Sequence, residues 1–443
     1  MAETFDLLIR GGTVVNQNGI GAADVGIRNG RFAAIGDLAQ ASAGETIDAK
    51  GLHVLPGVID TQVHFREPGL EHKEDLESGT RGAVLGGVVA VFEMPNTTPL
   101  TDTAAALEDK LKRAKGRAWA DHAFFVGATA ENAAHLAELE RLPGCSGVKI
   151  FMGASTGNLL VADDPTLARV LAHGRRRVAV HAEDETRMKA RRHLAEQGSD
   201  PANHPVWRDA ESARLATERI IRLARAAKRP VHVLHVTTAD EVPLLATNKD
   251  LITMEVTPQH LTLAAPDCYA RLGTKAQMNP PIREARHRDA LWDAVRLGIV
   301  DVLGSDHAPH TLEEKAKPYP QSPSGFPGVQ TLLPLMLNHV AEGRLSLQRL
   351  VDLTSAGPQR IYNIAGKGRL AVGYDADVTL VDLKAKRTIE TSWIASKAGW
   401  TPFEGSVVTG WPMGTIIRGR VVMRDGGLAN APTGEPVRFV DTM

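Results

Sequence analysis

The sequence predicts an α/β protein: a (β/α)8 barrel of the TIM type with a small β-sandwich built from both ends of the chain. In the middle, short apolar runs alternate with amphipathic stretches, which is the pattern of βα units. Eight such units occupy about 250 residues, the usual size of this barrel. Both ends instead alternate apolar and polar residues between turn signals, which is typical of short strands.

The barrel prediction rests on eight apolar runs and on the segments between them. Residues 103–117 and 211–229 carry apolar side chains at helical spacing. A doubly wound sheet is the alternative, but no glycine fingerprint for a dinucleotide follows any of the runs. The candidate strands are Val58–Val63, Val88–Glu93, His122–Val126, Gly147–Phe151, Val178–His181, Val231–His235, Ile252–Glu255 and Val300–Ser305.

The two ends of the chain are predicted to fold together, because neither offers a full core alone. Arg28-Asn29-Gly30-Arg31 is a strong hairpin signal, since Asn-Gly supplies the positive φ angles of a tight turn. We expect short antiparallel strands at both ends. The predicted domains are a composite β-sandwich of residues 1–55 and 370–443 and a barrel of residues 56–369.

Composition excludes several classes of protein. The chain carries 51 Lys and Arg against 52 Asp and Glu, so it lacks the basic surplus of a nucleic-acid binder. Its two cysteines, Cys145 and Cys268, cannot build a disulfide framework, which favours a reducing compartment. No signal peptide is visible, and no apolar run approaches the roughly 18 residues that span a bilayer. We therefore expect a cytoplasmic protein with no membrane and no nucleic-acid partner.

Polar residues at the ends of the predicted strands point to a metal site. In a (β/α)8 barrel the active site lies where the strands end. His64, Lys149, His181, His235 and Asp306 all stand at such positions, and imidazole and carboxylate ligands together suit zinc or another first-row divalent ion.

Each of these residues also has an ordinary structural interpretation. Most histidines beside strands are hydrogen-bonded core or loop residues, and Asp306 alone would suit the N-cap of a helix. Lys149 fits such an interpretation less well, because apolar residues flank it and a buried unpaired ammonium is costly. It needs either an anionic partner or a chemical change.

The chain resembles the dihydroorotases of the amidohydrolase superfamily, in their cyclic amidohydrolase branch. The resemblance covers nearly the whole sequence, and the order and spacing of its motifs match. These motifs are PGVIDTQVHFREPG, EMPNTTP, GVKIFMGASTG, VHAEDE, HVLHVTT, QMNPPIR and GSDHAPH.

The resemblance implies a zinc-dependent hydrolase holding one or two metal ions. Lys149 would be an N6-carboxylysine that bridges the metals, which would also remove the buried ammonium. His64 and Asp306 would bind the first zinc, and His181 and His235 the second. Asp306 would also act as the catalytic residue, taking a proton from the attacking water and passing it to the leaving nitrogen.

The implied reaction is the reversible hydrolysis of dihydroorotate to N-carbamoyl-aspartate in de novo pyrimidine biosynthesis. Arg66, Asn96 and His310 match the family's carboxylate-binding positions, and a guanidinium pairs well with a carboxylate. Asn279 resembles the family's contact with the ring amide. Arg66 alone would equally suit a surface ion pair with Glu67 or Glu71.

Two departures from the family pattern keep other hypotheses open. The first strand of relatives ends in His-x-His, whereas this chain has Gln62-Val63-His64, and an amide oxygen is a weak ligand for zinc. In residues 257–260, Gln259 stands where many relatives carry the first of two histidines. One alternative is a silent dihydroorotase-like subunit that supports aspartate transcarbamoylase. Another is a hydrolase of a different cyclic amide, of the hydantoin or allantoin type.

Two further expectations concern assembly and the mouth of the site. We expect a homo-oligomer, a dimer or a tetramer. Residues 311–328 are rich in Pro, Ser and Gly and follow the site directly, which suits either a lid or a passive connector.

Overall fold

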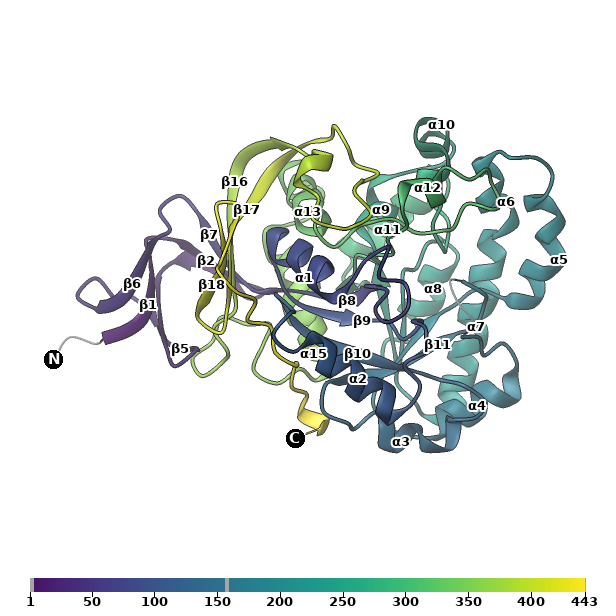
Figure 1. The fold of residues 1–443 in the computed structure, drawn as a ribbon, viewed down its shortest axis with the longest axis horizontal. Coiled ribbons are helices and arrows are strands. Elements are labelled where there is room, and N and C mark those ends of the chain that lie inside the picture. Colours follow the sequence, from purple (N-terminus) through teal and green to yellow (C-terminus); the bar gives the residue numbers. More distant parts are fainter. Residues whose placement is uncertain (1–3, 156–158, 443) are drawn as a thin grey trace.

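The computed structural model describes residues 4–155 and 159–442. Thr156 and Gly157, which end the GVKIFMGASTG motif, lie outside the described residues. A helix-coated barrel forms one side of the molecule, and layered sheets that contain both ends of the chain form the other (Figure 1). The predicted fold class is confirmed.

The barrel consists of eight parallel strands that pair in chain order from β8 to β15. It closes through a bridge between Val63, at the end of β8, and His307, just after β15. The strands are β8 Val58–Val63, β9 Val88–Glu93, β10 Asp121–Gly127, β11 Cys145–Phe151, β12 Val178–His181, β13 Val231–Val233, β14 Ile252–Val256 and β15 Val302–Leu303.

Two barrel strands are shorter than the sequence predicts. β13 ends at Val233 because His235 has a left-handed backbone, with φ 35°, that turns the chain out of the strand. β15 ends at Leu303, and Asp306 is likewise left-handed, with φ 46°. Both turns bring a predicted site residue to the mouth of the barrel.

Helices follow most of the strands and cover the outside of the barrel. The predicted helix at 211–229 is α7, which Asp209 caps and Lys228 ends in a left-handed conformation. The helices are α1 Leu76–Leu85, α2 Ala104–Ala114, α3 Leu136–Leu139, α4 Asp164–Ala172, α5 Glu185–Ala195, α6 His204–Trp207, α7 Ala210–Ala227, α8 Glu241–Ala246, α9 Pro258–Thr262, α10 Asp267–Leu272, α11 Ala285–Arg296, α12 Leu312–Lys315, α13 Leu332–Ala341, α14 Leu347–Val351 and α15 Gly357–Tyr362.

The two ends of the chain share a seven-stranded sheet of order β19-β18-β17-β16-β7-β2-β3. Its strands are β2 Thr13–Asn16, β3 Gly19–Ala22, β7 His53–Pro56, β16 Val378–Thr388, β17 Val407–Ile417, β18 Arg420–Arg424 and β19 Gly427–Leu428. The two ends meet where β7 pairs with β16, with Val54 opposite Leu380.

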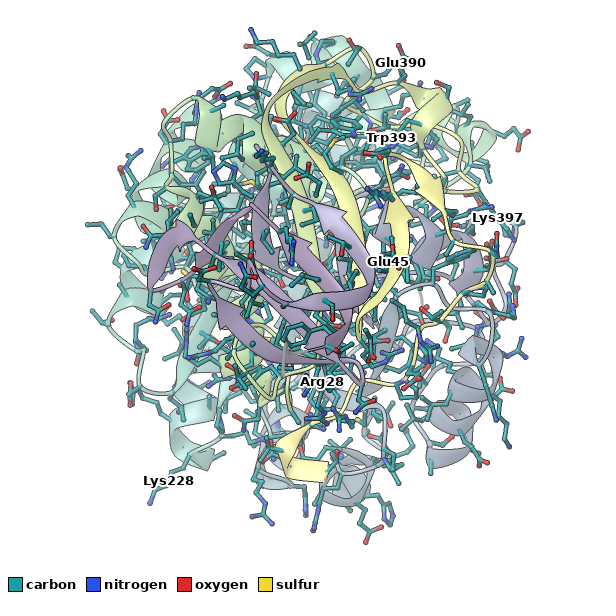
Figure 2. The ribbon with its side chains drawn as sticks, turned by 90° about the vertical axis from the view of Figure 1, so that its left-hand side faces the viewer. Arg28, Glu45, Lys228, Glu390, Trp393 and Lys397 are labelled. Atoms are coloured by element: carbon teal, nitrogen blue, oxygen red, sulfur yellow. The ribbon has the colours of Figure 1, made fainter. Side chains whose placement is uncertain are left out.

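A four-stranded sheet of order β5-β4-β1-β6 belongs to the N-terminal end. Its strands are β1 Thr4–Arg10, β4 Asp24–Arg28, β5 Arg31–Gly36 and β6 Ser42–Asp48. Side chains from both sheets, such as Ile27 and Val378, share one apolar cluster. In Figure 2 these N-terminal strands lie in front of the C-terminal ones.

The hairpin at Arg28–Arg31 is confirmed, with Asn29 and Gly30 at φ 53° and 71°. The expectation of antiparallel strands alone is wrong, because β1 pairs with β6 and β2 pairs with β7 in parallel. Alternation of apolar and polar residues is the same for both orientations, so the pattern could not distinguish them. The exact domain boundaries stay a prediction. Among the described residues, no helix combines the length and apolar character that crossing a membrane requires.

Candidate active site

The mouth of the barrel holds a cavity that most of the predicted site residues line. Asn96 and His310 are the predicted site residues absent from its lining, and each contacts a residue that lines it, Asn96 at His64 and His310 at Arg66. The lining residues in the described part of the chain are Gln62, His64, Arg66, Lys149, Phe151, Ser155, His181, His235, Asn279, Asp306, Ala308, Ser324 and Gly325.

Lys149 lies fully buried at the end of β11 and has an unsatisfied side chain. Its Nζ makes no hydrogen bond to any described residue and stands 4.4 Å from the centroid of the Phe151 ring. Burial lowers the pKa of Lys149 to about 7, against the opposing pull of Asp306 and Glu255. The side chain is therefore a buried, readily neutral amine without a partner, and carbon dioxide reacts with amines in that neutral form.

His181 and His235 form what we call the β12–β13 wall of the cavity. Nε2 of His181 lies 2.8 Å from Oε2 of Glu183, and Arg208 binds the same carboxylate with its Nε 3.1 Å from Oε1. Burial raises the pKa of Glu183, but Arg208 and the bond from His181 outweigh it and hold the pKa below its usual value. Because a carboxylate only accepts, Nε2 of His181 carries the proton, and Nδ1 presents a lone pair to the cavity.

The lone pair on His181 lies beside the second imidazole of the same wall. Nδ1 of His181 is 3.0 Å from Nε2 of His235, and Nδ1 of His235 has no partner among residues 4–155 and 159–442. Burial lowers the pKa of both histidines, so both rings are neutral. Neutral imidazoles are the form that binds metal.

Gln62, His64 and Asp306 form the β8–β15 wall. Nδ1 of His64 donates to Oδ1 of Asn96 at 2.8 Å, which leaves a lone pair on Nε2. That nitrogen lies 3.2 Å from Oδ1 of Asp306, and burial lowers the pKa of His64. Two electron-rich atoms therefore face each other, an arrangement that a cation between or beside them relieves. Gln62 donates to the same oxygen of Asp306 at 3.0 Å, and its own Oε1 has no partner in the described chain.

Three residues at this mouth have backbones that side chains rarely adopt. Arg66, His235 and Asp306 have φ of 67°, 35° and 46°. Such conformations are costly for residues other than glycine, and in proteins they gather at functional sites. All three line the cavity, so the backbone strain supports the position of the site independently of its side chains.

Arg66 is buried, with an exposed fraction of 2%, so the interpretation as a surface ion pair with Glu67 or Glu71 is wrong. Its Nε donates to the carbonyl of Pro309 at 3.2 Å, and one terminal nitrogen lies 3.3 Å from Nε2 of His310. Arg66 thus presents positive charge to the cavity, while His310 supports it from behind.

The donor set fits a metal centre built around a modified Lys149. No three His, Cys, Asp or Glu side chains converge on one point in the described residues, as expected when each wall supplies only two such groups. The pairs His181 with His235 and His64 with Asp306 line the same cavity as Lys149, whose Nζ has no hydrogen-bond partner among the described residues. An unmodified ammonium cannot complete either set. A carboxylated Lys149 would give each pair an anionic third ligand.

The second departure from the family pattern has a structural role. Nε2 of Gln259 donates to the carbonyl of Ser305 at 2.6 Å, next to Asp306. His260 lies 3.1 Å from the carbonyl of Pro280, next to Asn279. Both side chains therefore hold main chain that carries a site residue.

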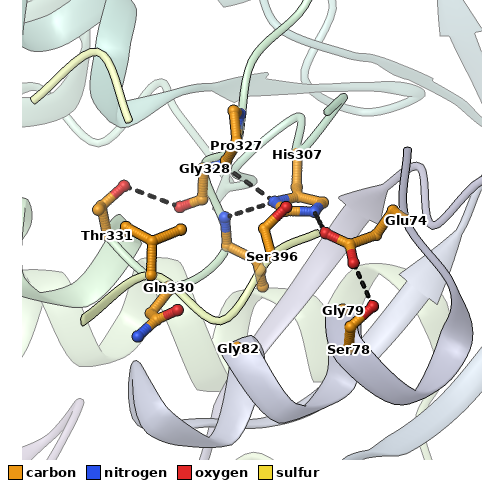
Figure 3. Close-up of a pocket in the computed structure, with 12 residues that line it drawn as sticks. Glu74, Ser78, Gly79, Gly82, His307, Pro327, Gly328, Gln330, Thr331 and Ser396 are labelled. Carbon is orange, nitrogen blue, oxygen red and sulfur yellow. Dashed lines mark hydrogen bonds and ion pairs between the residues drawn. The ribbon is translucent and has the colours of Figure 1, made fainter. Parts of the chain in front are cut away.

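A second pocket is lined by His307, the residue that follows Asp306, together with Glu74 and Gly328 (Figure 3). Nδ1 of His307 accepts from the N–H of Gly328 at 3.0 Å, and its Nε2 lies 3.3 Å from Oε2 of Glu74. The carbonyl of His307 accepts from the N–H of His64 at 2.7 Å. His307 therefore fixes the two halves of the β8–β15 wall to each other.

Residues 311–328 are firmly anchored at the mouth. Lys315 donates to the carbonyls of Gln277 and Pro323 at 3.2 and 2.7 Å, and Tyr319 and Phe326 are buried. Ser324 and Gly325 line the cavity. The lid function stays a prediction.

Sequence reasoning missed the buried residues that support the site, chiefly Glu183, Arg208, Asp60 and Glu255. Glu183 was detectable, because it follows His181 by two residues in VHAEDE. Glu255 is fully buried, accepts from the hydroxyl of Thr61 at 3.1 Å, and has its pKa raised by burial to about 8. No local pattern identifies such partners.

Comparison with known proteins identifies the family. The model of the amidohydrolase family matches residues 53–422. The chain belongs to the amidohydrolase family. This amidohydrolase is 36% identical to a dihydroorotase of Methanothermobacter thermautotrophicus over 91% of both chains. It is also 36% identical to an allantoinase of Rubrobacter xylanophilus over 98% of both.

Solved structures agree with this assignment. An L-hydantoinase (dihydropyrimidinase) from Arthrobacter aurescens superposes on the amidohydrolase with a TM-score of 0.93 and 32% identity, over 98% of this chain and 99% of that one. The resemblance to dihydroorotases that the motifs predicted is confirmed by the curated relatives.

Proposed function

We propose that this amidohydrolase is a zinc-dependent dihydroorotase that interconverts dihydroorotate and N-carbamoyl-aspartate. The observation that carries the proposal is the convergence, in one cavity, of a buried guanidinium with the candidate metal-binding side chains. A cyclic amide that bears a carboxylate needs both. Relatives named dihydroorotase support the same substrate.

The residues that would hold zinc are His64 and Asp306 on one wall and His181 and His235 on the other, and Lys149, once carboxylated, would be an anionic ligand available to both pairs. Bound zinc would supply a water of lowered pKa and polarisation of the amide carbonyl. The chain holds its ligands ready, because Glu183 fixes the tautomer of His181 and Asn96 fixes that of His64.

Asp306 is the candidate general base and acid. Its carboxylate is held by the amide of Gln62 at 3.0 Å and stands on a strained backbone that points it into the cavity. From there it takes the proton of the attacking water and returns it to the leaving ring nitrogen.

Arg66 is the candidate partner of the substrate carboxylate. Its guanidinium is desolvated, and a buried cation with few other partners binds a carboxylate strongly. Asn96 contacts His64 and His310 contacts Arg66, so we assign these two residues the support of His64 and Arg66. A homo-oligomer, a role beside aspartate transcarbamoylase and a cytoplasmic location stay predictions.

Asp306→Asn tests the catalytic assignment. We expect the variant to keep its fold and to lose turnover by about 1,000-fold or more, because the amide cannot carry the proton. Steady-state hydrolysis of dihydroorotate measures the turnover, and circular dichroism shows whether the fold is kept. Full activity in the variant would remove Asp306 from its role.

Arg66→Ala tests the substrate. The KM for dihydroorotate should rise about 100-fold, the effect of losing a buried charge-assisted pair, while the KM for an uncharged hydantoin changes little. Equal changes for both substrates would remove Arg66 from the carboxylate site.

A second candidate function is hydrolysis of a hydantoin or of allantoin. The similarity to the L-hydantoinase structure and to the allantoinase favours it. Assays of the zinc-loaded protein with dihydroorotate, hydantoin and allantoin distinguish the candidates, and no turnover of any of them would favour the silent subunit.

A further inference from the structure

His204 lies buried between the active-site cavity and a wider cavity outside it. It is the first residue of α6 and has an exposed fraction of 1%. The two cavities share Ser155, Asn279 and Ser324, and His204 lines the outer one. None of the motifs that indicated the family contains His204.

The partners of Nε2 fix where His204 carries its proton. Nε2 lies 3.0 Å from the carbonyl oxygen of Met278, 2.9 Å from the side chain of Asn279 and 3.4 Å from the Ser324 hydroxyl, which can accept. A carbonyl oxygen only accepts, so Nε2 must be the N–H of this ring. The ring is neutral, because burial and the nearby Arg208 lower the pKa of His204 to about 3.

This proton determines which way the Asn279 amide faces. Because Nε2 of His204 is a donor, the Asn279 atom that meets it is Oδ1, and Nδ2 points the other way. On that side it lies 3.5 Å from Oγ of Ser155, which also lines the active-site cavity. The side of Asn279 that faces Ser155, where both residues line the cavity, therefore carries an N–H donor and not a carbonyl.

We propose that His204 is a positioning residue that locks the Asn279 amide with its NH₂ toward the substrate, so that the ring atom bound there is a carbonyl oxygen. The proposal rests on the proposed function, in which Asn279 contacts the ring of a cyclic amide. It adds the residue that sets the polarity of this contact.

The polarity matters because such rings alternate carbonyl and N–H groups. Dihydroorotate and hydantoins both carry the sequence N–H, C=O, N–H, C=O around the ring. A flipped Asn279 would present its oxygen and pair with an N–H, one ring atom away. The amide to be cleaved would then be out of register with Asp306 and the candidate metal ligands. Such a displacement of the reacting groups lowers the rate strongly.

A purely structural role for His204 is the competing explanation. The ring makes edge contacts with Trp207 and Tyr319, at centroid distances of 5.8 and 5.7 Å, and a phenyl ring could make both. His204→Phe therefore preserves the shape and removes the N–H, while His204→Gln keeps an N–H donor. The two variants separate packing from hydrogen bonding.

The experiment is a double-mutant cycle on the zinc-loaded protein. His204→Phe should raise the KM for dihydroorotate about tenfold, the effect of one lost hydrogen bond, at unchanged zinc content. His204→Gln should stay within about threefold of wild type. Asn279→Ala should match His204→Phe, and the double variant should be no worse than Asn279→Ala.

Several outcomes would overturn the proposal. One is multiplication of the His204→Phe and Asn279→Ala effects, which would make the two residues independent. Another is a wild-type KM in Asn279→Ala. A third needs no variant: ¹⁵N-resolved NMR of the wild-type protein that shows the His204 proton on Nδ1.

The proposed function can fail separately. If the wild type hydrolyses hydantoin or allantoin and not dihydroorotate, the substrate assignment is wrong, and the same cycle measured on that amide decides the role of His204. If no cyclic amide is hydrolysed, the NMR tautomer decides it. An Nε2–H supports the locked amide, and an Nδ1–H excludes it.

Discussion

The two walls of the active-site cavity differ in how their histidines are held. On the β12–β13 wall, the partner of His181 is an ionised carboxylate that Arg208 also binds. On the β8–β15 wall, the partner of His64 is the neutral amide of Asn96, and a second amide, Gln62, occupies an oxygen of Asp306. A charged partner orients a ligand and raises its basicity more than an amide does. We therefore expect tighter metal binding at the β12–β13 wall.

The largest expected effect on metal affinity follows from removing the charge of Glu183 on the β12–β13 wall. Glu183→Gln should lower zinc affinity about 100-fold, because the tautomer of His181 is no longer fixed by an anion. Competition with a chromophoric chelator measures the affinity. Glu185→Gln is the matched control, since Glu185 accepts from the N–H of Ala154 and touches Lys189. Equal losses in both variants would contradict the role of Glu183.

Adding an imidazole to the β8–β15 wall, where we expect weaker metal binding, is the opposite change. Gln62→His restores an imidazole in place of an amide. The zinc affinity of the β8–β15 wall should rise about tenfold, which corresponds to about 1.4 kcal/mol. Metal analysis after dialysis should show higher occupancy in the variant. An unchanged metal content would mean that position 62 does not limit binding.

A smaller loss is expected from the neutral partner on the same wall. Asn96→Ala removes the acceptor at Nδ1 of His64. Zinc affinity should fall by about tenfold, which is the lower end of the range for partners of metal ligands. The chelator assay used for Glu183→Gln gives the ratio directly. A larger loss than in Glu183→Gln would invert the order of the two walls.

The last prediction concerns the pH dependence of stability through Glu255, which joins the walls by accepting from Thr61 and from the N–H of His235. Burial raises its pKa from 4.5 to about 8, so between these values the folded protein binds more protons than the unfolded chain. Its contribution to stability is therefore lost as the pH rises through this window, by at most about 1.4 kcal/mol per unit. Glu255→Gln should flatten that dependence, as measured by urea denaturation of the metal-free protein at pH 5 and pH 8.

The sequence was sufficient for the barrel because each strand is an apolar run. It also located most residues that line the candidate cavity, because polar residues follow those runs, while their roles stay predictions. Strand ends were less predictable, since the left-handed backbone at His235 leaves no mark in the hydrophobic pattern. The support of the site was hidden for another reason. Arg208 lies 25 residues from Glu183, and no periodicity links partners that only the fold brings together.

The composite sheet constrains how the chain can fold as it is synthesised. β7 pairs with β2 on one edge and with β16 on the other, and Leu380 of β16 faces Val54. At roughly 5–20 residues per second, a ribosome needs about 15–65 s to reach β16 after making β7. Throughout that time β7 is an open strand edge, the kind of template on which chains aggregate. Nascent chains stalled before β16 should therefore bind chaperones, and release should coincide with the emergence of β16.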